Sequence, residues 1–369
     1  MNGEIFNKIA GRRRILVAPL DWGLGHATRC IPIIKALAEQ GCEVIIAAEN
    51  NVETLLKAEF PELQFLPLRG YYMRYSRKAL WLPFVLLWQF PKLFRTIRYE
   101  RKWLKRTVEA FQIDAVISDN RFGLYHSSVP CIYITHQLMI ETGNRLSRWL
   151  AQKMHYHFIN KFTGCWVPDA EGKINLAGKL SHPQKLPLIP VQYIGPLSRF
   201  QKMELDKKYD LLICLSGPEP QRTIFENILL NDLKNYAGKA LLARGLPGND
   251  KQIVAPNDHV EIRSYLSSTA LNIAIEESVI VISRSGYTSI MDLIKLGQNA
   301  ILVPTPGQKE QEYLAEVLMQ QQLFYCADQD NFSLEKVLAA VNKFSFNKIA
   351  VDQEIYKKTI KEFVETIVA

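Results

Sequence analysis

The sequence predicts an α/β protein built from two domains, each with a parallel β-sheet and helices on its faces. Residues 15–18 and 42–48 are short apolar runs, and the stretch between them, which ends at Gly41, has the length and pattern of a helix. This strand–helix–strand order places consecutive strands parallel in one sheet. The second half repeats the order, because several apolar runs each end in a turn rich in glycine, serine or proline: 211–215, 240–243, 279–282 and 300–303.

Length and composition agree with this architecture. A chain of 369 residues is long enough for two domains of ordinary size, and 48% hydrophobic with 22% charged residues is a normal globular composition. Between the halves, prolines cluster in a short stretch that predicts a stiff connector: Pro183, Pro187, Pro190 and Pro196. We expect a ligand cleft between the domains, because ligands often bind at domain interfaces.

The charge balance and the cysteines narrow the functional class. A formal net charge of +8 favours an anionic partner, for which a nucleotide, a lipid headgroup and a nucleic acid all qualify. No RNA- or DNA-binding motif accompanies the charge, so a nucleic-acid partner is not expected. The six cysteines show no Cys-x-x-Cys pair, which predicts free thiols in a reducing compartment and no zinc site. Residues 12–14 are arginines that lead directly into a strand, so we expect no signal peptide and a cytoplasmic protein.

The turn after the first strand, residues 19–29, carries the first candidate site. Gly23 and Gly25 permit tight turning and close approach of a ligand at the carboxyl end of the strand, where open α/β sheets bind ligands. Thr28 stands where the dinucleotide fingerprint needs a third glycine, so a nicotinamide or flavin cofactor is not predicted. His26 begins the following helix. It is either a functional side chain in the mouth of the sheet or a structural residue of the turn.

The most apolar stretch of the chain is 79–94. It is too short to span a bilayer and is interrupted by Pro83 and Pro91. Lysines and arginines flank it on both sides, and tryptophan and phenylalanine beside such a cluster are typical of a segment on a membrane surface. We therefore consider 70–110 a candidate membrane-surface segment. The alternative is a buried helix pair with solvated basic faces.

Two further strands of the first domain end in polar residues. The run 115–118 is followed by Asp119, and the run 131–134 is followed shortly by His136. Both endings belong to the same carboxyl-terminal edge of the sheet as His26. Asp119 and His136 are thus secondary site candidates, although the usual polarity of loops explains them equally well.

In the second domain the stretch 279–297 is the most informative. An apolar strand, 279–282, passes through Ser285 and Gly286 into a helix that stops at Gly297. Small residues at a helix start leave backbone N–H groups and the positive end of the helix dipole open to a phosphate. Asp292 lies about two turns further on in a mostly apolar run, where ribose hydroxyls would give its carboxylate partners. The alternative is a plain capped helix with a solvated carboxylate.

These residues resemble glycosyltransferase family 28, a group of GT-B fold that includes the peptidoglycan N-acetylglucosaminyltransferase and the plant galactolipid synthases. The turn 283–286 is similar to the phosphate-binding turn of that family, and Asp292 stands where the family has a ribose-binding acidic residue, usually Glu. The stretch 304–313 aligns without gaps with the donor-sugar loop, which gives Gln311 and Glu312 the role of the family's Gln-Gln pair. Leu266 falls near the uracil-contacting backbone, and the segment 195–199 is similar to a linker whose arginine, here Arg199, reaches the diphosphate.

The resemblance implies a GT-B architecture of two Rossmann-like domains facing across a cleft. It implies an acceptor domain at 1–190, a linker at 191–208, a donor domain at 209–350 and a C-terminal helix at 351–369 that packs back on the first domain. In the first domain the family's glycine-rich loop ends Gly-Gly-His, whereas this chain has Trp22-Gly23-Leu24-Gly25-His26.

The implied activity is an inverting, metal-independent glycosyltransferase of the hexosyltransferase class. It would move a sugar from a UDP-sugar, UDP-GlcNAc or a UDP-hexose, to an acceptor hydroxyl, with no cofactor besides the nucleotide sugar. The acceptor is a lipid or a glycan in this interpretation, and the enzyme would work in the cytoplasm or peripherally on the inner face of the cytoplasmic membrane. A UDP-sugar 2-epimerase on the same fold and a non-catalytic nucleotide-binding protein are the alternatives.

The chemistry assigns roles to the candidate residues. Negative charge on the leaving diphosphate would be met by the helix start at Ser285 and Gly286, by the turn at Ser216 and Gly217, and by Arg199 or Arg244. His26, whose ordinary pKa lies near neutral pH, is the expected general base for the acceptor hydroxyl. Asp119 and His136 are its reserves on the acceptor side, together with Gly23 and Gly25.

Overall fold

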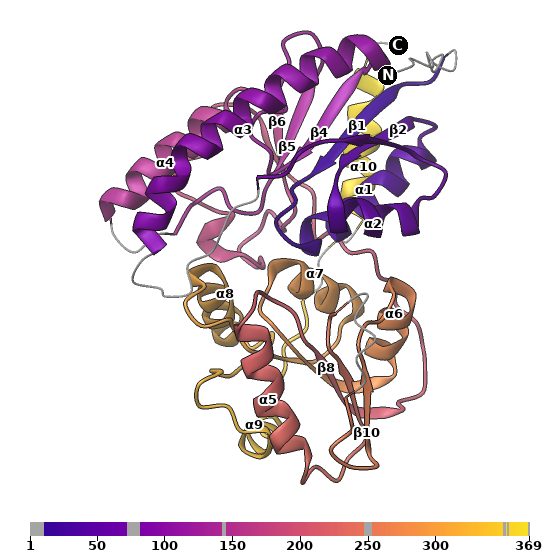
Figure 1. The fold of residues 1–369 in the computed structure, drawn as a ribbon, viewed down its shortest axis with the longest axis vertical. Helices are drawn as coiled ribbons and strands as arrows, with labels where there is room; N and C mark the ends of the chain where they lie inside the picture. The colour runs from indigo at the N-terminus through magenta and orange to yellow at the C-terminus, as the bar shows by residue number, and fades with distance from the viewer. Residues whose placement is uncertain are drawn as a thin grey trace. The chain divides into compact units, whose positions relative to one another are not determined.

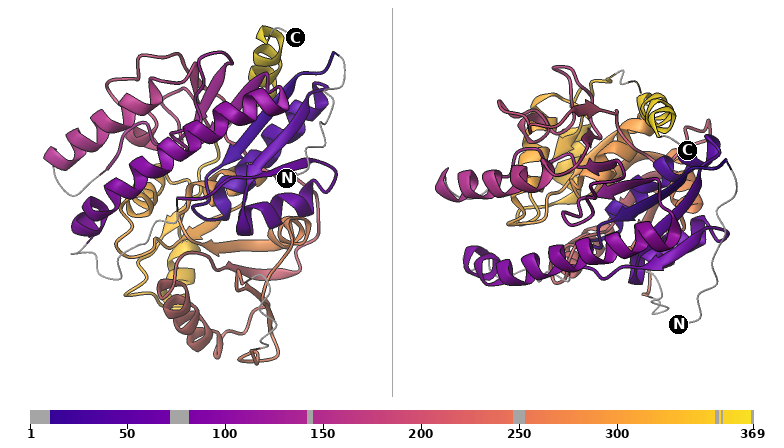
Figure 2. Two further views of the ribbon diagram at one scale, coloured as in Figure 1. Left: turned by 45° about the horizontal axis from the view of Figure 1, so that its top comes forward. Right: turned by 90° about the horizontal axis from the view of Figure 1, so that it is seen from above.

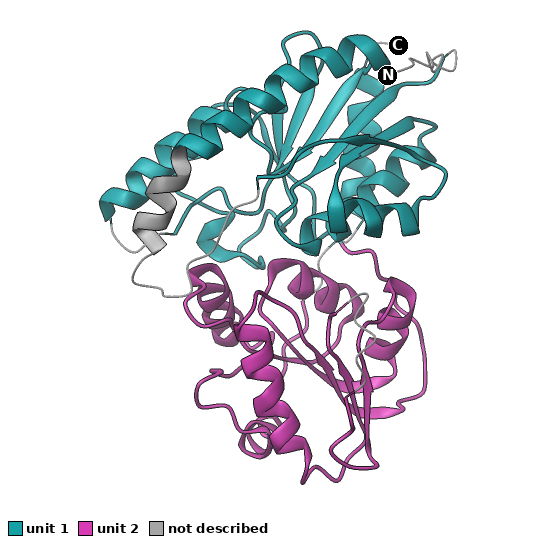
Figure 3. Ribbon diagram, in the orientation of Figure 1, with its two compact units in different colours: residues 1–197, 351–369 teal, residues 198–350 magenta. Residues whose placement is uncertain are grey.

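The computed structural model describes residues 11–71, 82–141, 145–246, 253–349, 352 and 354–367, with the backbone alone for 82–90. The chain divides into two compact units, of which unit 1 comprises residues 1–197 and 351–369, and unit 2 comprises residues 198–350 (Figure 3). Unit 1 is therefore formed from two separate stretches of the sequence. The chain leaves unit 1 after residue 197 and returns to it after residue 350.

Unit 1 is built on a seven-stranded sheet with the order β3-β2-β1-β4-β5-β6-β7, in which every pairing is parallel. The central strands are buried on both faces, as the continuous apolar runs of parallel strands require. The strands are β1 (Arg14–Pro19), β2 (Glu43–Ala48), β3 (Gln64–Pro67), β4 (Ala115–Asp119), β5 (Cys131–Ile134), β6 (Gly164–Val167) and β7 (Val191–Tyr193).

Helices cover both faces of this sheet. α3 and α4 contribute Leu104 and Ile159 to a core cluster on one face, which also holds Leu16 and Tyr133. On the other face α1 contacts α2 and α10, so the last helix of the chain completes unit 1 (Figure 1). The helical elements are α1 (Leu24–Glu39), α2 (Asn50–Glu59), α3 (Leu82–Phe111), α4 (Arg145–Ile159), the short 3-10 turn η2 (Gly178–Leu180) and α10 (Ile355–Thr366).

Unit 2 repeats this plan on a six-stranded parallel sheet with the order β10-β9-β8-β11-β12-β13. Phe225 and Leu229 of α5 and Leu334 and Val337 of α9 pack on one face of the sheet in a second core cluster. The elements are β8 (Tyr209–Cys214), α5 (Gln221–Leu233), β9 (Ala240–Ala243), β10 (Val260–Arg263), α6 (Ser268–Glu276), β11 (Ser278–Ser283), α7 (Tyr287–Leu296), β12 (Ala300–Leu302), α8 (Lys309–Gln320), β13 (Tyr325–Cys326) and α9 (Leu334–Val341).

The two sheets share one topological feature that matters for function. In each, the first strand lies in the middle, and the chain moves to one side before it crosses back to the other. The order of strands therefore reverses between β1 and β4 in unit 1, and between β8 and β11 in unit 2. Ligands of open α/β sheets bind at the carboxyl ends of the strands at such a switch point. The predicted α/β class with two parallel sheets is confirmed.

The stretch 191–208, expected to be a linker, is divided between the units. Val191–Tyr193 forms β7, which pairs with β6 as the edge strand of the first sheet. Ser198 and the residues after it belong to unit 2, where the backbone N–H of Gln201 donates to Asn272 Oδ1 at 2.8 Å. The segment thus contributes structure to both units, because its apolar residues Ile194 and Leu197 are fully buried.

The candidate membrane-surface segment 70–110 is described only in part. Residues 72–81 lie outside the described part of the chain, and α3 continues the segment from residue 82. None of the described helices combines the length and the apolar character that crossing a membrane requires.

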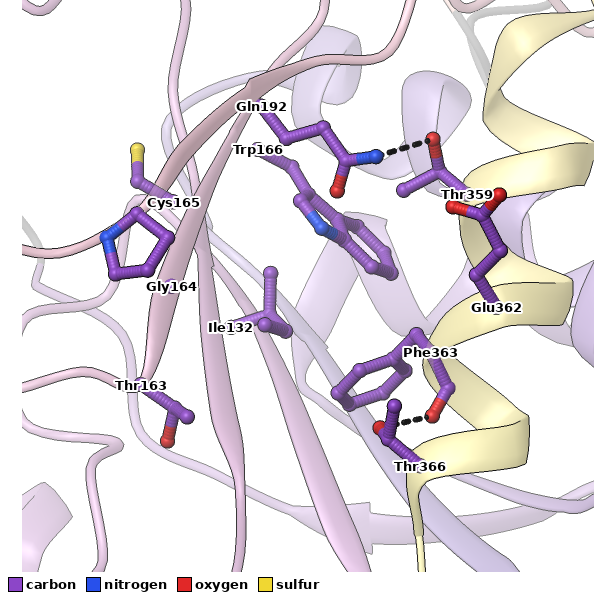
Figure 4. A pocket seen from close by; sticks show the side chains of 11 residues that line it. Ile132, Thr163, Gly164, Cys165, Trp166, Gln192, Thr359, Glu362, Phe363 and Thr366 are labelled. Atoms are coloured by element: carbon purple, nitrogen blue, oxygen red, sulfur yellow. Dashed lines mark hydrogen bonds between the residues drawn. The ribbon is translucent and has the colours of Figure 1, made fainter.

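A cavity of about 240 Å³ is lined by residues of β6, β7 and α10, and the contacts around it hold α10 on unit 1 (Figure 4). The Trp166 indole of β6 meets the Phe363 ring of α10 edge-on at 5.3 Å between centroids. Beside them Gln192 Nε2 donates to Thr359 Oγ1 at 3.2 Å, which joins β7 to the same helix. Thr163 and Gly164, which also line the cavity, lie at the amino end of β6. The cavity therefore lies away from the edge where the strands end.

Candidate active site

The carboxyl edge of the unit 1 sheet places His26 beside the end of β4. Gly23, the residue before α1, has φ +84°, a left-handed conformation that glycine adopts without strain. The turn it makes starts α1 at Leu24 and sets His26 in the first turn of the helix, with 15% of its side chain exposed. Gly25 lies within that same turn, where its carbonyl accepts the Thr28 hydroxyl at 3.0 Å.

His26 belongs to a buried charge cluster with Asp119 and Arg29. The carboxylate of Asp119, fully buried at the end of β4, accepts the Arg29 Nε–H at 2.9 Å and lies 3.0 Å from His26 Nδ1. Arg29 is one turn after His26 on α1, and its Nη2 also donates to Asp119 Oδ1. Its Nη1 lies 3.2 Å from Nδ1 of His136, which follows β5. The structure thus brings together all three titratable acceptor-side candidates around one arginine.

The cluster keeps the imidazole neutral and the carboxylate ionised. Burial and the Arg29 guanidinium both lower the pKa of His26, against the opposite pull of Asp119. Burial disfavours the charged form of Asp119, but the attraction of Arg29 and His26 outweighs it and lowers the pKa of that carboxyl. At neutral pH the site therefore holds a neutral histidine next to a carboxylate, which is the state a general base requires.

The position of the imidazole proton decides whether His26 can accept another. Arg29 Nη2 lies 2.8 Å from His26 Nδ1, yet a guanidinium only donates and a carboxylate only accepts. Arg29 already has Asp119 as its acceptor, so the Nδ1 proton is best placed between His26 and Asp119. Nε2 is then unprotonated and can take a proton from a hydroxyl.

A second buried network supports this cluster from behind. Arg121, two residues after Asp119, donates to the Glu100 carboxylate of α3 at 2.8 Å and to the carbonyl of Pro19 at 3.2 Å. Tyr71 donates its hydroxyl to the other Glu100 oxygen at 2.8 Å. Pro19 ends β1 and Arg121 follows β4, so the network holds together the two chain segments that carry His26 and Asp119.

In unit 2, the turn between β11 and α7 is built for a close backbone approach. Ser285 is fully buried, and its hydroxyl donates to the carbonyl of Gln311 at 2.9 Å. Gly286 precedes α7, and a Cβ added there would meet nothing within 4 Å. The Ser285 hydroxyl thus holds the turn. What the turn can offer an anion is its backbone and the dipole of α7.

Asp292 lies on α7 beside the residues that follow the first unit. Its carboxylate accepts the Ser198 hydroxyl at 2.5 Å, and the charge of Arg199 is close enough to favour its ionised form. Burial dominates nonetheless and raises the pKa of Asp292 to about 6. Arg199 Nε and Nη1 are buried with no hydrogen-bond partner among the described residues. A buried carboxylate and two buried donors without acceptors are what a polar ligand would satisfy.

The turn after β8 meets the loop after β12. Gly217 has φ +102°, and a Cβ there would lie 3.5 Å from Thr305 Oγ1. Ser216 precedes it and is exposed. Thr305 is itself buried, and its hydroxyl has no partner among the described residues. Because β8 and β11 are the switch-point strands of unit 2, Gly217, Thr305 and the α7 turn lie where a ligand is expected.

Gln311 and Glu312 close the loop that precedes α8. Gln311 Oε1 accepts the Thr305 N–H at 2.8 Å, and Glu312 Oε1 accepts the Gly307 N–H at 2.8 Å. The second Glu312 oxygen pairs with Lys309 Nζ at 2.7 Å. Both side chains, predicted to hold sugar hydroxyls, therefore have loop-closing contacts. In Gln311 the amide nitrogen remains for another partner.

Arg244, predicted to meet the diphosphate, is engaged inside unit 2. It follows β9, is 6% exposed and donates through Nε to Glu226 of α5 at 2.5 Å. Arg222 joins the same carboxylate at 3.2 Å. The counter-charge on α5 explains why the side chain turns inward. Leu266 lies in the loop between β10 and α6 and is half-buried.

Two residues of the candidate site, Arg29 and Ser198, escaped the sequence analysis, and only the first had a signal. Arg29 is a cation inside the otherwise apolar helix α1, one turn after His26, which is the spacing for a shared helix face. Arg284 lies in the turn that resembles a phosphate-binding turn. It is 2% exposed and donates to the carbonyls of Val303 and Gln221, so it holds neighbouring loops together. Ser198 had no signal, because its partner Asp292 lies far along the chain. Within the described residues, no group of three or more His, Cys, Asp or Glu side chains is arranged to hold a metal.

The chain is similar in sequence to known glycosyltransferases. Residues 244–368 match the glycosyltransferase family 28 C-terminal domain. A UDP-N-acetylglucosamine–N-acetylmuramyl-(pentapeptide) pyrophosphoryl-undecaprenol N-acetylglucosamine transferase of Buchnera aphidicola is 27% identical over 42% of this chain, and the match spans 44% of its own length. An uncharacterised glycosyltransferase of Methanosarcina acetivorans is 22% identical over 83% of both chains.

The fold has relatives among solved structures. The glycosyltransferase of kitacinnamycin superposes with a TM-score of 0.64 and 13% identity, covering 97% of this chain and 94% of the other. Similarity at that identity concerns the fold, and it agrees with two parallel-sheet units of Rossmann-like order. Residues 244–368 thus match a family 28 glycosyltransferase domain, and the two parallel-sheet units have the GT-B fold.

Proposed function

We propose that the protein is an inverting, metal-independent glycosyltransferase that uses a UDP-sugar, with unit 2 as the donor domain and unit 1 as the acceptor domain. The observation that carries the proposal is the pairing of chemistries at the two switch points. Unit 1 holds a neutral imidazole backed by a carboxylate, and unit 2 holds an open helix start with Asp292 and Arg199 beside it. A displacement at a sugar carbon needs a base for the attacking hydroxyl and hydrogen-bond donors that stabilise the charge of the leaving diphosphate.

The donor would be held by unit 2. Asp292 would accept ribose hydroxyls, and the free N–H groups of Arg199 would meet the diphosphate. The backbone at Gly217 and Gly286 would supply further donors to the phosphates, and the amide of Gln311 would reach the sugar. The Buchnera relative acts on UDP-N-acetylglucosamine by its name, which favours UDP-GlcNAc or a UDP-hexose here.

The reaction balances as a single displacement. The acceptor oxygen attacks the sugar C1 while the bond between C1 and the phosphate oxygen breaks. The electrons of that bond stay on the nucleoside diphosphate, whose charge Arg199 and the α7 terminus would stabilise without a metal. The acceptor proton passes to His26 Nε2, and Asp119 stabilises the imidazolium that forms. One displacement from the face opposite the leaving group inverts the configuration at C1.

Donor specificity and turnover provide the test. Calorimetry with UDP, TDP and GDP should show tightest binding of UDP, and turnover of UDP-GlcNAc or a UDP-hexose should require an added lipid or glycan extract. The anomeric configuration of the product should be opposite to that of the donor. No turnover with any nucleotide sugar in the presence of such extracts would refute the proposal. Formation of an epimerised nucleotide sugar without any acceptor would instead identify the protein as an epimerase.

A further inference from the structure

Ser198, the first residue of unit 2, has a hydroxyl group whose two hydrogen bonds are assigned by its partners. Its Oγ accepts the backbone N–H of Phe200 at 3.1 Å, because an N–H group can only donate. Its proton is donated to Oδ1 of Asp292 on α7 at 2.5 Å, because an ionised carboxylate can only accept. The hydroxyl group therefore points at the carboxylate that is proposed to hold the ribose.

The backbone that carries this hydroxyl group is held in place without a ligand. The segment after Ser198 runs past α6 (Figures 1 and 2), and there Gln201 forms two hydrogen bonds with the side chain of Asn272. The Gln201 N–H donates to Oδ1 at 2.8 Å, and its carbonyl accepts from Nδ2 at 2.9 Å. Phe200, which precedes these contacts, is buried. The position of Ser198 is therefore set before a nucleotide binds.

The Asp292 carboxylate consequently meets a ligand with one of its oxygens in use. Among the described residues, Ser198 is the one hydrogen-bond donor to this carboxylate, and Oδ1 is the oxygen engaged. The other oxygen, Oδ2, remains for a ligand. Turning the Ser198 hydroxyl away to release Oδ1 is unfavourable, because Asp292 is only 8% exposed and the hydroxyl would lose its acceptor with little water to replace it.

The residue after Ser198 indicates that this pair faces a ligand. Arg199 has two buried nitrogens, Nε and Nη1, without hydrogen-bond partners among the described residues. Burial raises the pKa of Asp292, and the charge of Arg199 opposes that shift, so the two side chains are near each other. Unused donors beside a half-used carboxylate suit a ligand that carries both negative charge and hydroxyl groups. A ribonucleoside diphosphate has both.

We propose that Ser198 takes the place of one ribose hydroxyl group on Asp292, so that the donor site recognises a single hydroxyl of the sugar ring. A ribose has neighbouring 2′ and 3′ hydroxyls, and a carboxylate with both oxygens available would bind the two together. With Oδ1 in use, the two hydroxyls share Oδ2, and either one suffices. The site therefore takes 2′-deoxyribonucleoside diphosphate sugars as well as ribonucleoside diphosphate sugars. The inference deepens the proposed function and rests on it for the assignment of Asp292 to the ribose.

Calorimetry of the full chain with a series of uridine diphosphates tests the inference, because the base and the phosphates stay constant while the hydroxyls change. The wild type should bind 2′-deoxy-UDP and 3′-deoxy-UDP within about 3-fold of UDP, because one hydroxyl remains in each. It should bind 2′,3′-dideoxy-UDP at least about 10-fold more weakly, because Oδ2 then receives no hydroxyl from the ligand.

Ser198→Ala should change this profile. With Oδ1 released, the carboxylate can bind both hydroxyls, so removal of either the 2′ or the 3′ hydroxyl should now weaken binding at least about 10-fold. The titrations are run at about pH 8, well above the Asp292 pKa of about 6, because removing the Ser198 hydrogen bond would raise that pKa further.

Two further variants serve as controls. Ser198→Thr keeps a hydroxyl group at this position and should bind the series as the wild type does. Ser278→Ala is the matched serine-to-alanine change, because the Ser278 hydroxyl donates to the carbonyl of Ala274 at 2.6 Å and lies at the amino end of β11. It should also leave the wild-type profile unchanged. Thermal unfolding establishes that each variant is folded, and the wild-type series needs no variant.

Several outcomes would overturn the inference. One is a loss of about 10-fold or more when the wild type binds either singly deoxygenated nucleotide. Another is the same profile for the wild type and Ser198→Ala, which would make the hydrogen bond a structural link between the segment and α7. Equal wild-type affinity for UDP and 2′,3′-dideoxy-UDP would remove Asp292 from the ribose and leave UDP binding, and with it the proposed function, intact. Absence of UDP binding in the wild type would instead contradict the proposed function, and this inference with it.

Discussion

The carboxyl edges of the two sheets have the same topology but carry different chemical groups. In unit 1 the switch point is occupied by a closed cluster of ionisable side chains, in which Arg29, Asp119 and His26 satisfy one another. In unit 2 the equivalent point consists of small residues and backbone at Gly217 and Gly286, and its nearby arginine, Arg199, keeps two buried N–H groups without partners.

This difference in side chains suits the two edges to different functions. A proton acceptor must have its protonation state fixed before the substrate arrives, so its partners are internal. An anion site must leave its donors unused, so that the ligand supplies the acceptors. The same strand order can thus host either function, and the side chains that follow the strands decide which.

The strongest test of this contrast removes one arginine from each edge. Arg29→Met should cost about 3–5 kcal/mol of unfolding free energy, because it leaves the buried carboxylate of Asp119 without its main counter-charge. Arg199→Met should change stability by less than about 1 kcal/mol, because Nε and Nη1 have no described hydrogen bond to lose and Asp292 can take up a proton when the nearby charge is removed. UDP affinity should respond in the opposite order, falling roughly 10- to 100-fold in the Arg199 variant alone. Chemical denaturation and calorimetry measure both quantities, and equal stability losses would remove the contrast.

The next prediction concerns turnover. His26→Ala should lower the transfer rate at least about 10²-fold and leave UDP affinity unchanged, because the proposed base lies in unit 1 and the proposed donor-binding groups lie in unit 2. His259→Ala, an exposed histidine of unit 2, is the matched control. If His26→Ala turned over as fast as the wild type, Nε2 would not be the proton acceptor.

Asp292 gives a pH-dependent prediction. Its folded pKa of about 6 lies above the ordinary value of about 3.9, so ionisation is harder in the folded state. Below about pH 4 the carboxyl is protonated folded or unfolded and costs nothing, and the cost grows as pH rises to about 6. Asp292→Asn should therefore stabilise the ligand-free protein by about 2–3 kcal/mol above pH 6, and have little effect near pH 4. Thermal unfolding across this range measures it.

Ligand binding should show the reverse dependence on pH. Ribose hydroxyls donate best to the ionised carboxylate, so UDP affinity of the wild type should rise between about pH 5 and 7 and then level off. Asp292→Asn should bind UDP more weakly at pH 7 and without that rise. A wild-type affinity independent of pH in this window would mean that Asp292 does not contact the ligand.

The smallest expected effect compares two glycines. Gly23→Ala and Gly217→Ala should each cost about 1 kcal/mol, because both have positive φ and neither new Cβ meets an obstacle closer than 3.5 Å. Only the Gly217 variant should also weaken UDP binding, since its backbone lies at the edge proposed to bind the donor. Equal effects on UDP affinity would place both turns outside the donor site.

The sequence predicted most of the architecture because its signals are local. Apolar runs such as those of β1 and β11, and the left-handed Gly297 that ends α7 with φ +62°, are properties of short stretches. Candidates that closely follow a strand, such as Gly217 after β8, could be placed at the edge of the sheet because strand ends are visible in the sequence. Partners distant along the chain were not predictable. Arg244 was expected to face a ligand, but Glu226 on another element draws it inward.

The same limit explains Ser285 and Glu312. Each has a residue type suited to ligand contact, yet each is used to close a loop through a hydrogen bond to backbone: Ser285 to Gln311 and Glu312 to Gly307. Periodicity reports which elements form and roughly where they end, whereas the direction of a polar side chain depends on what tertiary packing places next to it. Arg29 was detectable in principle, because a cation in an apolar helix needs a buried partner.

The return of α10 to unit 1 has a consequence for biosynthesis. A ribosome releases residues 198–350 before it releases α10, so the inner unit has its whole sequence while the outer one still lacks a helix. Until then the indole of Trp166 has no Phe363 ring to pack against. Unit 1 is thus completed only after the whole of unit 2 has been synthesised, and unit 2, whose sequence is continuous, is the part suited to fold as an independent fragment.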